Sequence, residues 1–306
     1  MRQPRSTLLP QHGREHFFKF YSAKSALKII ESNSLQWSSP LSFNDPFDTQ
    51  TSLIGRVDVN LFSDRFVDSL RAIVFDDELP RFFKRSNRIH AAVEILRVNR
   101  DRLSAAEILD NLAAGARDAG DALEIHFRTF SDTVRESISN AWVFCLTERI
   151  DNVVMWSHYA DQHRGIGFKL NCVKEVDHPF LIAKEMDYLD EYPRVGDDLA
   201  LADHFSGVAE INMADMAWRI AYSKHRDWAY EREWRSYVPK LDQTNRAATL
   251  LMPQDQRVFG EIYLGCRMDP RVRNTVLRAC RKYLPRMTIL QARKSREEFS
   301  LEFDEI

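Results

Sequence analysis

The stretch that most constrains the fold is residues 35–48, LQWSSPLSFNDPFD. Its first residues, LQW, form a short apolar run that predicts a strand, and the NDP sequence at residues 44–46 predicts a tight turn. Asn and Asp hydrogen-bond their own backbone in turns, while proline fixes its own φ and moves the preceding residue out of the helical region. Phe43 and Phe47 flank the turn, so we expect both to pin the loop to a core. An anchored turn with no further role explains these residues equally well.

The chain has the composition of an ordinary globular protein. Its 306 residues are 44% hydrophobic and 29% charged, which favours a single elaborated domain, 1–306, over two equal domains. The formal net charge of −2 gives no overall attraction to nucleic acid or to an anionic membrane, although a local basic patch is compatible with it. Charge therefore neither indicates nor excludes a nucleic-acid partner.

Cysteine use and hydropathy predict a cytoplasmic protein. The cysteines are far apart and show no paired metal-ligand spacing, so we expect them to stay reduced. The N-terminal residues, MRQPRSTLLPQHGREH, have no apolar segment of the kind found in secretory signals. No apolar run approaches the roughly 20 residues that a membrane span needs. We therefore expect no contact with a membrane.

The hydrophobic pattern changes along the chain and predicts a β-rich domain with a helical insertion. Residues 1–15 have no periodicity and predict a loose N-terminal arm. A short aromatic strand follows, and then a helix that Ser22 caps. From 58 to 140 apolar residues recur at helical spacing in successive segments, one of which opens with a capping box of Ser104 and Glu107. We interpret residues 58–140 as the helical insertion.

After the insertion, short apolar strands alternate with helices without a regular βαβ period, which predicts an α+β protein. The strands are expected at residues 141–147, 165–170, 180–188, the latter part of 228–240, 249–252, 262–264, 287–290 and 299–303. A helical stretch is expected over 197–224, and Asp269 with Pro270 predicts the start of another helix. No glycine-rich phosphate loop is present, so any NAD would bind without the dinucleotide fingerprint of dehydrogenases.

Four blocks of sequence carry a resemblance to a known family. They are FFKFYSAKSALKIIESNSLQWSSPLSFNDPFD at 17–48, MWSHYADQHRGIGF at 155–168, YEREWR at 230–235 and EIYLG at 261–265. In these blocks and in their order, the chain resembles the bacterial domain-of-unknown-function family 2971. That family is similar to the ADP-ribosyltransferases, which bind NAD in a small split β-sandwich. The resemblance implies an ADP-ribosyltransferase-like split β-sandwich core with a helical insertion.

Glu231 and Glu233, in the YEREWR block, are the candidate catalytic residues. Residues two apart on a strand point to the same face, so the two carboxylates are expected to project together. One of two neighbouring carboxylates can be held near neutrality, and a fixed carboxylate stabilises the oxocarbenium-like charge of glycosidic cleavage. The resemblance implies that Glu233 is catalytic and that Glu231 orients the ribose or the acceptor. The residues alone favour the alternative, in which both glutamates form ion pairs with Arg232, Arg235 or Lys224 on a surface strand.

The resemblance also implies a nicotinamide pocket on the first two strands. Ser38 and Ser39 occupy the place where ADP-ribosyltransferases have a serine that supports this pocket. Lys19 and Tyr21 occupy the first-strand place where these enzymes have an arginine or histidine against NAD. The family often has arginine where this chain has Tyr21, which leaves contact with phosphate or ribose to Lys19, or stacking to Tyr21. An equally good explanation is that Ser38 and Ser39 are simply two small residues at the end of a strand.

A second aromatic cluster is the remaining candidate binding surface, formed by Trp156, His158, Tyr159 and His163. Tyrosine and tryptophan can stack on a base or on nicotinamide, and histidine can act as acid, base or hydrogen-bond donor near neutral pH. His158 and His163 are five positions apart, which does not place them on one helical face as a two-histidine metal site requires. We therefore predict no metal. An equally strong alternative is that His158 and Tyr159 only lock their helix onto the loop at residues 43–47.

These residues, completed by Asn44 and Asp45 of the turn, predict an enzyme that uses NAD or a related nucleotide. It would transfer ADP-ribose from NAD to a macromolecule, or hydrolyse NAD, and by resemblance it would act as a toxin or in phage defence. The acceptor macromolecule stays open. One alternative is a non-catalytic module that binds a nucleotide or a protein. Another is a metal-dependent nucleic-acid enzyme, for which Asp45, Asp48 and Glu233 would have to converge within a few ångströms.

Overall fold

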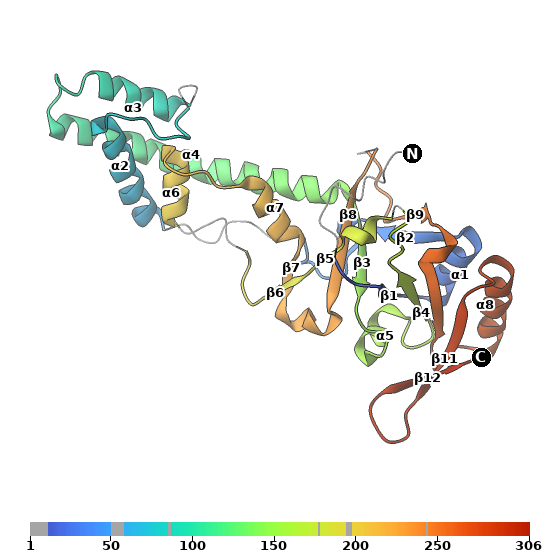
Figure 1. Cartoon of the computed structure of the whole chain (residues 1–306). Helices are drawn as coiled ribbons and strands as arrows, with labels where there is room; N and C mark the ends of the chain where they lie inside the picture. The colour runs from blue at the N-terminus through green and yellow to red at the C-terminus, as the bar shows by residue number, and fades with distance from the viewer. Residues whose placement is uncertain (1–11, 50–57, 85–86, 177, 194–197, 243) are drawn as a thin grey trace. The chain divides into compact units, whose positions relative to one another are not determined.

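The computed structural model describes residues 12–49, 58–84, 87–176, 178–193, 198–242 and 244–306. The chain forms two compact units (Figure 1). Unit 1 consists of Met1–Asp48, Ile138–Asp190 and Tyr222–Ile306, and unit 2 of Thr49–Ser137 and Glu191–Ala221. The helical insertion expected at 58–140 thus corresponds to the first segment of unit 2, which also takes in a second segment. Most of the N-terminal arm expected at 1–15 lies outside the described residues.

Unit 1 is built on one large, mostly antiparallel sheet, so the protein is a mixed α+β structure. Among the described residues the main path of the sheet runs β12-β11-β10-β4-β1-β3-β2-β9, with β8 paired to β3 and β5 paired to β8. The strands are β1 (His16–Tyr21), β2 (Ser34–Ser38), β3 (Ala141–Thr147), β4 (Ile166–Asn171), β5 (Lys184–Glu185), β8 (Glu233–Pro239), β9 (Thr249–Pro253), β10 (Phe259–Leu264), β11 (Thr288–Lys294) and β12 (Leu301–Glu305). A separate small parallel pair joins β6 (Asp187–Leu189) to β7 (Ser223–His225). Among the strands of the large sheet that the structure describes, only β10 and β11 pair in parallel.

The sheet branches at β3. One edge of β3 pairs with β8 along its whole length, from Ala141 opposite Pro239 to Thr147 opposite Glu233. The other edge is shared, because β1 pairs with β3 only at Thr147 whereas β2 pairs with it only at Val143. β1 continues into β4, β10, β11 and β12, and β2 continues into β9. The two branches therefore separate at β3 and leave room between β1 and β2.

The strand that begins the fold, HFFKFY, is buried on both faces of the sheet. Phe17 and Tyr21 lie in one apolar cluster, and Phe18 and Phe20 lie in another. On the first side α1 (Ala23–Ser32) and α8 (Pro270–Tyr283) pack against each other over the sheet. On the second side α5 (Val153–Tyr159) covers it. Aromatic residues on both faces of β1 thus fix two layers of helix around one sheet.

Side-chain caps set the starts of these helices. Ser22 accepts a hydrogen bond from the Ser25 backbone N–H, as its position before the first helix predicted. Asp269 caps α8 and Pro270 occupies its first turn, which confirms the expected helix start. Asn152 caps α5 in the same way. Each of these short polar residues satisfies backbone donors that have no partner inside the helix.

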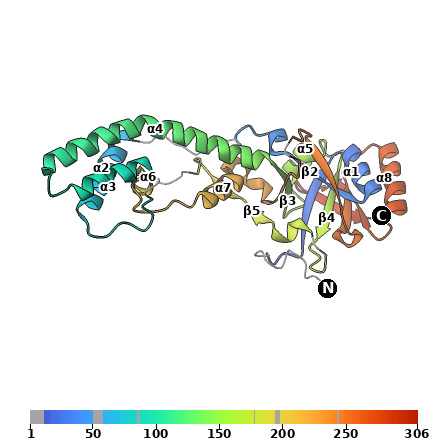
Figure 2. The ribbon, with the colours of Figure 1, turned by 90° about the horizontal axis from the view of Figure 1, so that it is seen from above.

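Unit 2 is helical. Its elements are α2 (Val59–Phe75), α3 (Arg88–Val98), most of α4 (Ala105–Ser139), α6 (Asp198–Ser206) and α7 (Met213–Ala221). Phe62, Phe66 and Leu70 of α2 are buried, and Arg65 forms an ion pair of 2.8 Å with Asp203 on α6. The Ser104–Glu107 capping box is present at the start of α4. The segment that this capping box opens continues without a break as one 35-residue helix, α4 (Figure 2).

The loop that follows β2 is anchored by its carboxylates, not by both of its aromatic residues. Asp45 and Asp48 are buried, and Asp45 accepts a hydrogen bond of 2.9 Å from the Phe47 backbone N–H. Phe43 is half-buried against Arg235, with the guanidinium carbon 5.1 Å from the ring centre. Phe47 is 60% exposed, so the expectation that both phenylalanines pin the loop is wrong for Phe47. Asp48 anchors the loop because its carboxylate binds the buried Arg235, whereas Asp45 stabilises the turn itself.

One strand expected from an apolar pattern is mostly replaced by tighter structure, and another is confirmed. Residues Pro179–Ile182 form a 3-10 helix, and only the short β5 and β6 follow it within 180–188. Residues Arg226–Glu231 form a 3-10 helix that precedes β8, and β8 is the strand expected in the latter part of 228–240. None of the described helices is both long enough and apolar enough to cross a membrane.

Candidate functional site

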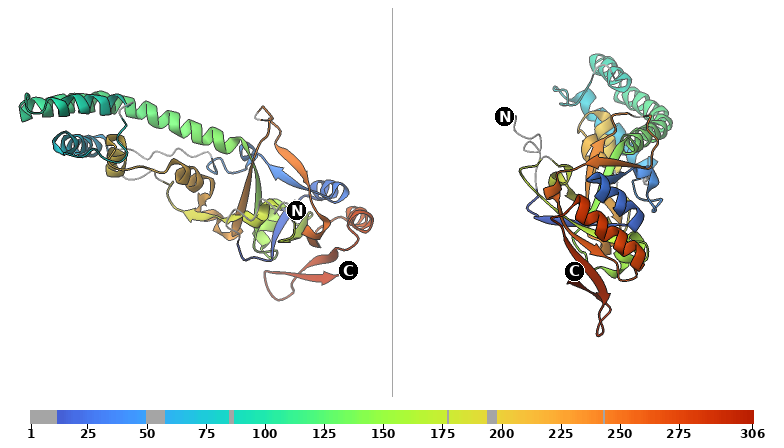
Figure 3. Two further views of the ribbon diagram at one scale, coloured as in Figure 1. Left: turned by 45° about the horizontal axis from the view of Figure 1, so that its top comes forward. Right: turned by 90° about the vertical axis from the view of Figure 1, so that its right-hand side faces the viewer.

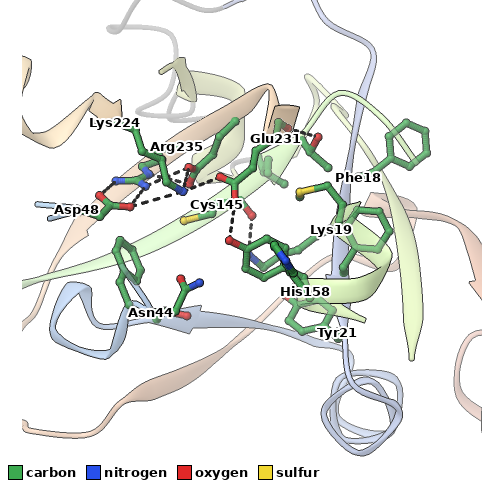
Figure 4. Close-up of a pocket in the computed structure, with 18 of the residues that line it drawn as sticks. Phe18, Lys19, Tyr21, Asn44, Asp48, Cys145, His158, Lys224, Glu231 and Arg235 are labelled. Atoms are coloured by element: carbon green, nitrogen blue, oxygen red, sulfur yellow. Dashed lines mark hydrogen bonds and ion pairs between the residues drawn. The ribbon is translucent and has the colours of Figure 1, made fainter. Parts of the chain in front are cut away.

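A cavity of about 380 Å³ lies in unit 1, where β1 and β2 separate along β3 (Figure 4). Its volume falls in the range of roughly 300–1,000 Å³ that is usual for small-ligand sites. β1, β2 and the loop after β2 provide part of the wall, β3 and β8 provide another part, and α5 closes one side. The polar residues that line it are Lys19, Gln36, Ser38, Ser42, Asn44, Asp48, Thr147, His158, Tyr159, Lys224, Glu231, Glu233 and Arg235.

Arg235 is the centre of a buried ion cluster in this cavity. Its Nε donates to Glu233 Oε1 at 2.7 Å, and its Nη2 donates to Glu233 Oε2 at 3.0 Å. On its other side Nη1 donates to Asp48 Oδ1 at 2.7 Å, and Nη2 also donates to Asp48 Oδ2. The planar guanidinium thus binds two carboxylates by pairs of hydrogen bonds. Since Arg235 is only 1% exposed, the loss of one partner would leave a buried charge uncompensated.

Lys224, on β7, connects the second glutamate to this cluster. Its Nζ lies 2.5 Å from Glu231 Oε2, 3.1 Å from Glu233 Oε2 and 3.7 Å from Asp48 Oδ2. Three carboxylates therefore share two cations, Lys224 and Arg235. When all five groups are ionised, the cluster carries one negative charge in excess.

The two glutamates have opposite proton affinities. Burial raises the pKa of Glu231, and repulsion from Glu233 raises it further, to about 7, against the opposing effects of Lys224 and Tyr159. Burial also disfavours ionisation of Glu233, but Arg235 and Lys224 outweigh it and hold the pKa of Glu233 below its usual value. Neighbouring carboxyls with separated pKa values are the usual arrangement of an acid–base pair. Glu231 is thus the group that can exchange a proton near neutral pH, and Glu233 is the permanent anion.

The backbone brings the glutamates together by a turn, not by a strand. Glu231 ends a 3-10 helix, Arg232 adopts a left-handed conformation with φ 43°, and Glu233 begins β8. The expectation that both glutamates lie two apart on one strand is therefore wrong. Thr147 Oγ1 donates to the Glu231 carbonyl at 2.5 Å, and the Glu233 backbone N–H donates to the Tyr188 hydroxyl at 2.8 Å. These contacts fix both sides of the turn.

Tyr159 of α5 is the second partner of Glu231. Its hydroxyl donates to Glu231 Oε1 at 2.5 Å, and burial raises the pKa of Tyr159 well above its usual value. Tyr159 therefore stays protonated and holds one oxygen of Glu231 in place. At the more exposed edge of the cavity, His158 Nδ1 and the Tyr230 hydroxyl are 3.0 Å apart.

Lys19 contributes a separate positive charge from β1. Its Nζ donates to the Cys145 carbonyl and lies 4.5 Å from the centre of the Phe144 ring. Burial lowers the pKa of Lys19, and Glu233 partly opposes this effect. Within the described part of the chain, no carboxylate lies within ion-pairing distance of Lys19. Because an ammonium group has three donors, hydrogen-bonding capacity remains for an anionic ligand.

The structure brings most of the residues singled out in the sequence to this cavity. They are Lys19, Tyr21, Ser38, Asn44, His158, Tyr159, Glu231 and Glu233. Tyr21 is buried, and its hydroxyl donates to the Gln36 carbonyl at 3.3 Å.

Four of the sequence-predicted residues do not line the cavity. Ser39 is buried and accepts a hydrogen bond of 3.2 Å from Lys240. Asp45 stabilises its own turn. Trp156 is fully buried and donates from Nε1 to the Ile150 carbonyl at 2.6 Å. His163 lines a different cavity of unit 1, with its Nε2 3.1 Å from Ser157 Oγ.

Sequence reasoning considered Arg235 and Lys224 only as surface partners of the glutamates, and Asp48 only as a ligand in the metal-dependent alternative. It missed the buried cluster that these residues form together. Asp48 and Arg235 were inside the blocks that drew attention, FNDPFD and YEREWR, but nothing local indicated that they meet. Cys145 and Thr147 lie opposite Arg235 and Glu233 on the paired strands, so they share the cavity face. Lys224 was noted only as a surface partner, whereas it is 8% exposed.

The carboxylates of this site are arranged around cations of the protein. Asp48 and Glu233 are both bound to Arg235, while the Asp45 side chain binds its own loop. Across the residues that the structure describes, no group of three or more His, Cys, Asp and Glu side chains is placed to hold a metal ion.

Comparison with known proteins gives one family. The family model described as "Protein of unknown function (DUF2971)" matches residues 155–236. The matched segment contains His158, Tyr159, Lys224, Glu231 and Arg235, so the similarity covers much of the cavity. The blocks at 17–48 and 261–265 lie outside it. No curated protein and no solved structure shows a significant match to the chain.

Proposed function

We propose that the cavity of unit 1 binds NAD, and that the protein transfers ADP-ribose from NAD to a macromolecule or to water. The observation that carries this proposal is the adjacent pair Glu231 and Glu233, whose pKa values are displaced in opposite directions. Cleavage of a glycosidic bond uses such a pair, one carboxyl to move a proton and one fixed anion to stabilise the oxocarbenium-like transition state.

The charge of the cavity supports NAD as the ligand. The excess negative charge of the Asp48, Glu231 and Glu233 cluster suits the positive nicotinamide ring and the cationic ribosyl transition state. Lys19 lies apart from this cluster and has donors available, which suits the pyrophosphate. A ligand with a cationic and an anionic end matches both sides of the cavity.

The proposed reaction assigns a different task to each glutamate. The bond between ribose C1′ and the nicotinamide nitrogen breaks, and its electron pair leaves with neutral nicotinamide. Glu233, held by Arg235, supplies constant negative charge to the developing cation. The acceptor hydroxyl or water attacks C1′, and its proton passes to the Glu231 carboxylate, which Tyr159 orients.

The branching of the sheet supports a relation to the ADP-ribosyltransferases. β1 and β2 contact β3 at different places, so the sheet divides where the cavity lies. The split β-sandwich of those enzymes binds NAD in a gap of this kind. We propose this relation together with the activity, and toxin or phage-defence action as its biological setting.

One observation favours a second candidate, a non-catalytic binding module. Each of the three carboxylates already has a cationic partner in the structure, as a purely structural network would. In that case the cavity would bind a nucleotide without cleaving it.

Two measurements on the wild-type protein separate these candidates. Calorimetric titration with NAD tests binding, and release of nicotinamide, with and without cell lysate as a source of acceptors, tests cleavage. We expect binding and release, with release stimulated by lysate if the acceptor is a macromolecule. Binding without release would support the binding module. If the protein does not bind NAD at millimolar concentration, it neither cleaves NAD nor serves as a binding module for this nucleotide.

A further inference from the structure

α8 is strongly positively charged, whereas the chain as a whole is close to neutral. The protein has 43 basic and 45 acidic residues, yet no Asp or Glu occurs between residues 270 and 286. The basic residues of that segment are Arg271, Arg273, Arg278, Arg281, Lys282 and Arg286.

Helical spacing aligns several of these side chains on one face. The inner side of α8 is formed by Val276, Ala279 and Cys280, which are buried. Arg271, Arg278 and Lys282 are exposed and follow one another at intervals of seven and four positions, which is one line along a helix. At 1.5 Å per residue this line is about 16 Å long. Figure 3, in its right-hand view, looks onto α8 with α1 beside it.

The cations of this line have no carboxylate partner among the described residues. Arg278 Nη2 donates to Thr275 Oγ1 at 3.3 Å. Lys282 contacts the neighbouring Tyr283 side chain, with its Nζ 4.7 Å from the ring centre, and Glu31 of α1 acts on it only at longer range. Two exposed arginines elsewhere in unit 1, Arg149 and Arg257, do have such a partner, since each binds an aspartate at 2.8 Å. The charge of α8 is thus left uncompensated by the fold.

Two placements of these charges are unfavourable for the helix, although Lys282 in its last turn interacts favourably with the helix dipole. Arg271 lies in the first turn of α8, where the helix dipole favours an acid, and that turn contains none. Arg278 and Lys282 are four positions apart, and like charges at this spacing repel. The buried residues of α8 hold it in the fold, so its outer face is available to bind a partner. Binding to a polyanion would relieve both unfavourable effects.

We propose that the outer face of α8, defined by Arg271, Arg278 and Lys282, binds the phosphate backbone of a nucleic acid. Arginine suits phosphate because its planar guanidinium donates paired hydrogen bonds. The line of charges is long enough for several phosphates, since each strand of a duplex carries one phosphate per roughly 3.4 Å of helix axis. A helix that binds a membrane surface presents an apolar face to the lipid, and the apolar side of α8 is buried in the core. The contact is with the backbone and is independent of base sequence.

The test is fluorescence anisotropy of labelled single-stranded RNA, single-stranded DNA and duplex DNA with the full-length protein, over a series of salt concentrations. We expect at least one of these probes to bind with affinity that falls as salt rises. The variant Arg271→Gln/Arg278→Gln/Lys282→Gln should bind at least about tenfold more weakly. Its slope of log affinity against log salt should be smaller by about 2 to 3, since each phosphate contact contributes roughly 0.7–0.9.

A matched control removes the same charge from other exposed positions of unit 1. It is the variant Arg164→Gln/Lys184→Gln/Arg226→Gln, which should keep the wild-type affinity to within a few-fold. Thermal melting should show both variants folded, because all six side chains are exposed. An equal loss of nucleic-acid affinity in both variants would overturn the proposal. So would the absence of binding to any probe at low salt. Binding to vesicles with anionic lipid that depends on α8, without binding to nucleic acid, would overturn it as well.

Discussion

At the scale of single residues, the protonation state of Glu231 decides what the cavity can do. Glu231 is buried between Lys224 and Tyr159 and lies beside a second carboxylate that is permanently ionised. Its pKa of about 7 means that it is partly protonated under ordinary conditions. Glu233, by contrast, is held by Arg235 in its ionised state. The chemistry that we propose depends on this difference between two residues only two positions apart.

This difference predicts how stability changes with pH. The pKa of Glu231 is raised from 4.5 to about 7, so the folded state retains its proton where the unfolded state has lost it. Stability from this group is therefore full below pH 4.5 and is lost as pH rises toward 7. The variant Glu231→Gln lacks this titration. As the pH rises from 5 to 8, the free energy of unfolding of the variant should therefore increase relative to that of wild type, by on the order of 2 kcal/mol.

Urea unfolding of both proteins at several pH values measures this effect. Glu233 contributes with the opposite sign, because its pKa is lowered and its stabilisation is lost only as pH falls below 4.5. A constant difference between the variant and wild type from pH 5 to pH 8 would contradict the raised pKa of Glu231.

Replacement of Arg235 should destabilise unit 1 strongly. Arg235→Met leaves Asp48 and Glu233 buried with Lys224 as their remaining cation. Breaking a buried ion pair from one side typically costs about 3–5 kcal/mol. Denaturant unfolding should show this loss, whereas Arg257→Gln, which breaks an exposed pair with Asp255, should leave the transition unchanged. Equal effects of the two variants would refute the central role assigned to Arg235.

At the scale of elements, the position of β3 decides where the cavity forms. β3 binds β8 along one edge and divides its other edge between β1 and β2. Glu233 and Arg235 project from β8 at this branch point, and α5 adds Tyr159 from the other side. The site thus depends on how closely α5, its following turn and β1 approach one another.

Gly165 marks the closest of these approaches and gives an element-scale prediction. A Cβ at Gly165 would lie 2.2 Å from the Tyr21 carbonyl and 2.8 Å from the Ala160 carbonyl, both backbone atoms. Gly165→Ala should therefore push β1 away from the turn after α5, lower the melting temperature by several degrees and weaken ligand binding. Gly115→Ala is the matched control, because nothing lies within 4 Å of its Cβ in α4 and alanine favours a helix by roughly 0.5–1 kcal/mol. Differential scanning calorimetry compares the two, and an unchanged Gly165→Ala protein would contradict the close approach.

At the scale of the whole molecule, the sequence predicted local structure better than it predicted the site. Ser22 and Asp269 begin helices as expected, because a cap needs only the next few residues. The α+β class followed from the mixture of strand and helix periods. The branching at β3 could not be predicted, because it depends on pairing between strands that are far apart in the chain.

The ion cluster shows the same limit. Asp48, Lys224 and Arg235 come from a loop, β7 and β8, and no local pattern indicates that their side chains meet. The glutamate pair was identified, but as neighbours on a strand, because the left-handed conformation of Arg232 has no sequence signal as clear as glycine. Residues such as Trp156 were singled out for their aromatic character and serve the core instead.

The measurement that tests the central claim most directly compares Glu231→Gln with Glu261→Gln in nicotinamide release from NAD. Glu261 lies outside the cavity but has matching partners, Lys169 at 2.6 Å and the Tyr263 hydroxyl. We expect Glu231→Gln to bind NAD nearly as wild type and to release nicotinamide about 10²-fold or more slowly, while Glu261→Gln keeps the wild-type rate of release. If both variants release nicotinamide at the wild-type rate, Glu231 does not take part in the reaction and the proposed chemistry is wrong.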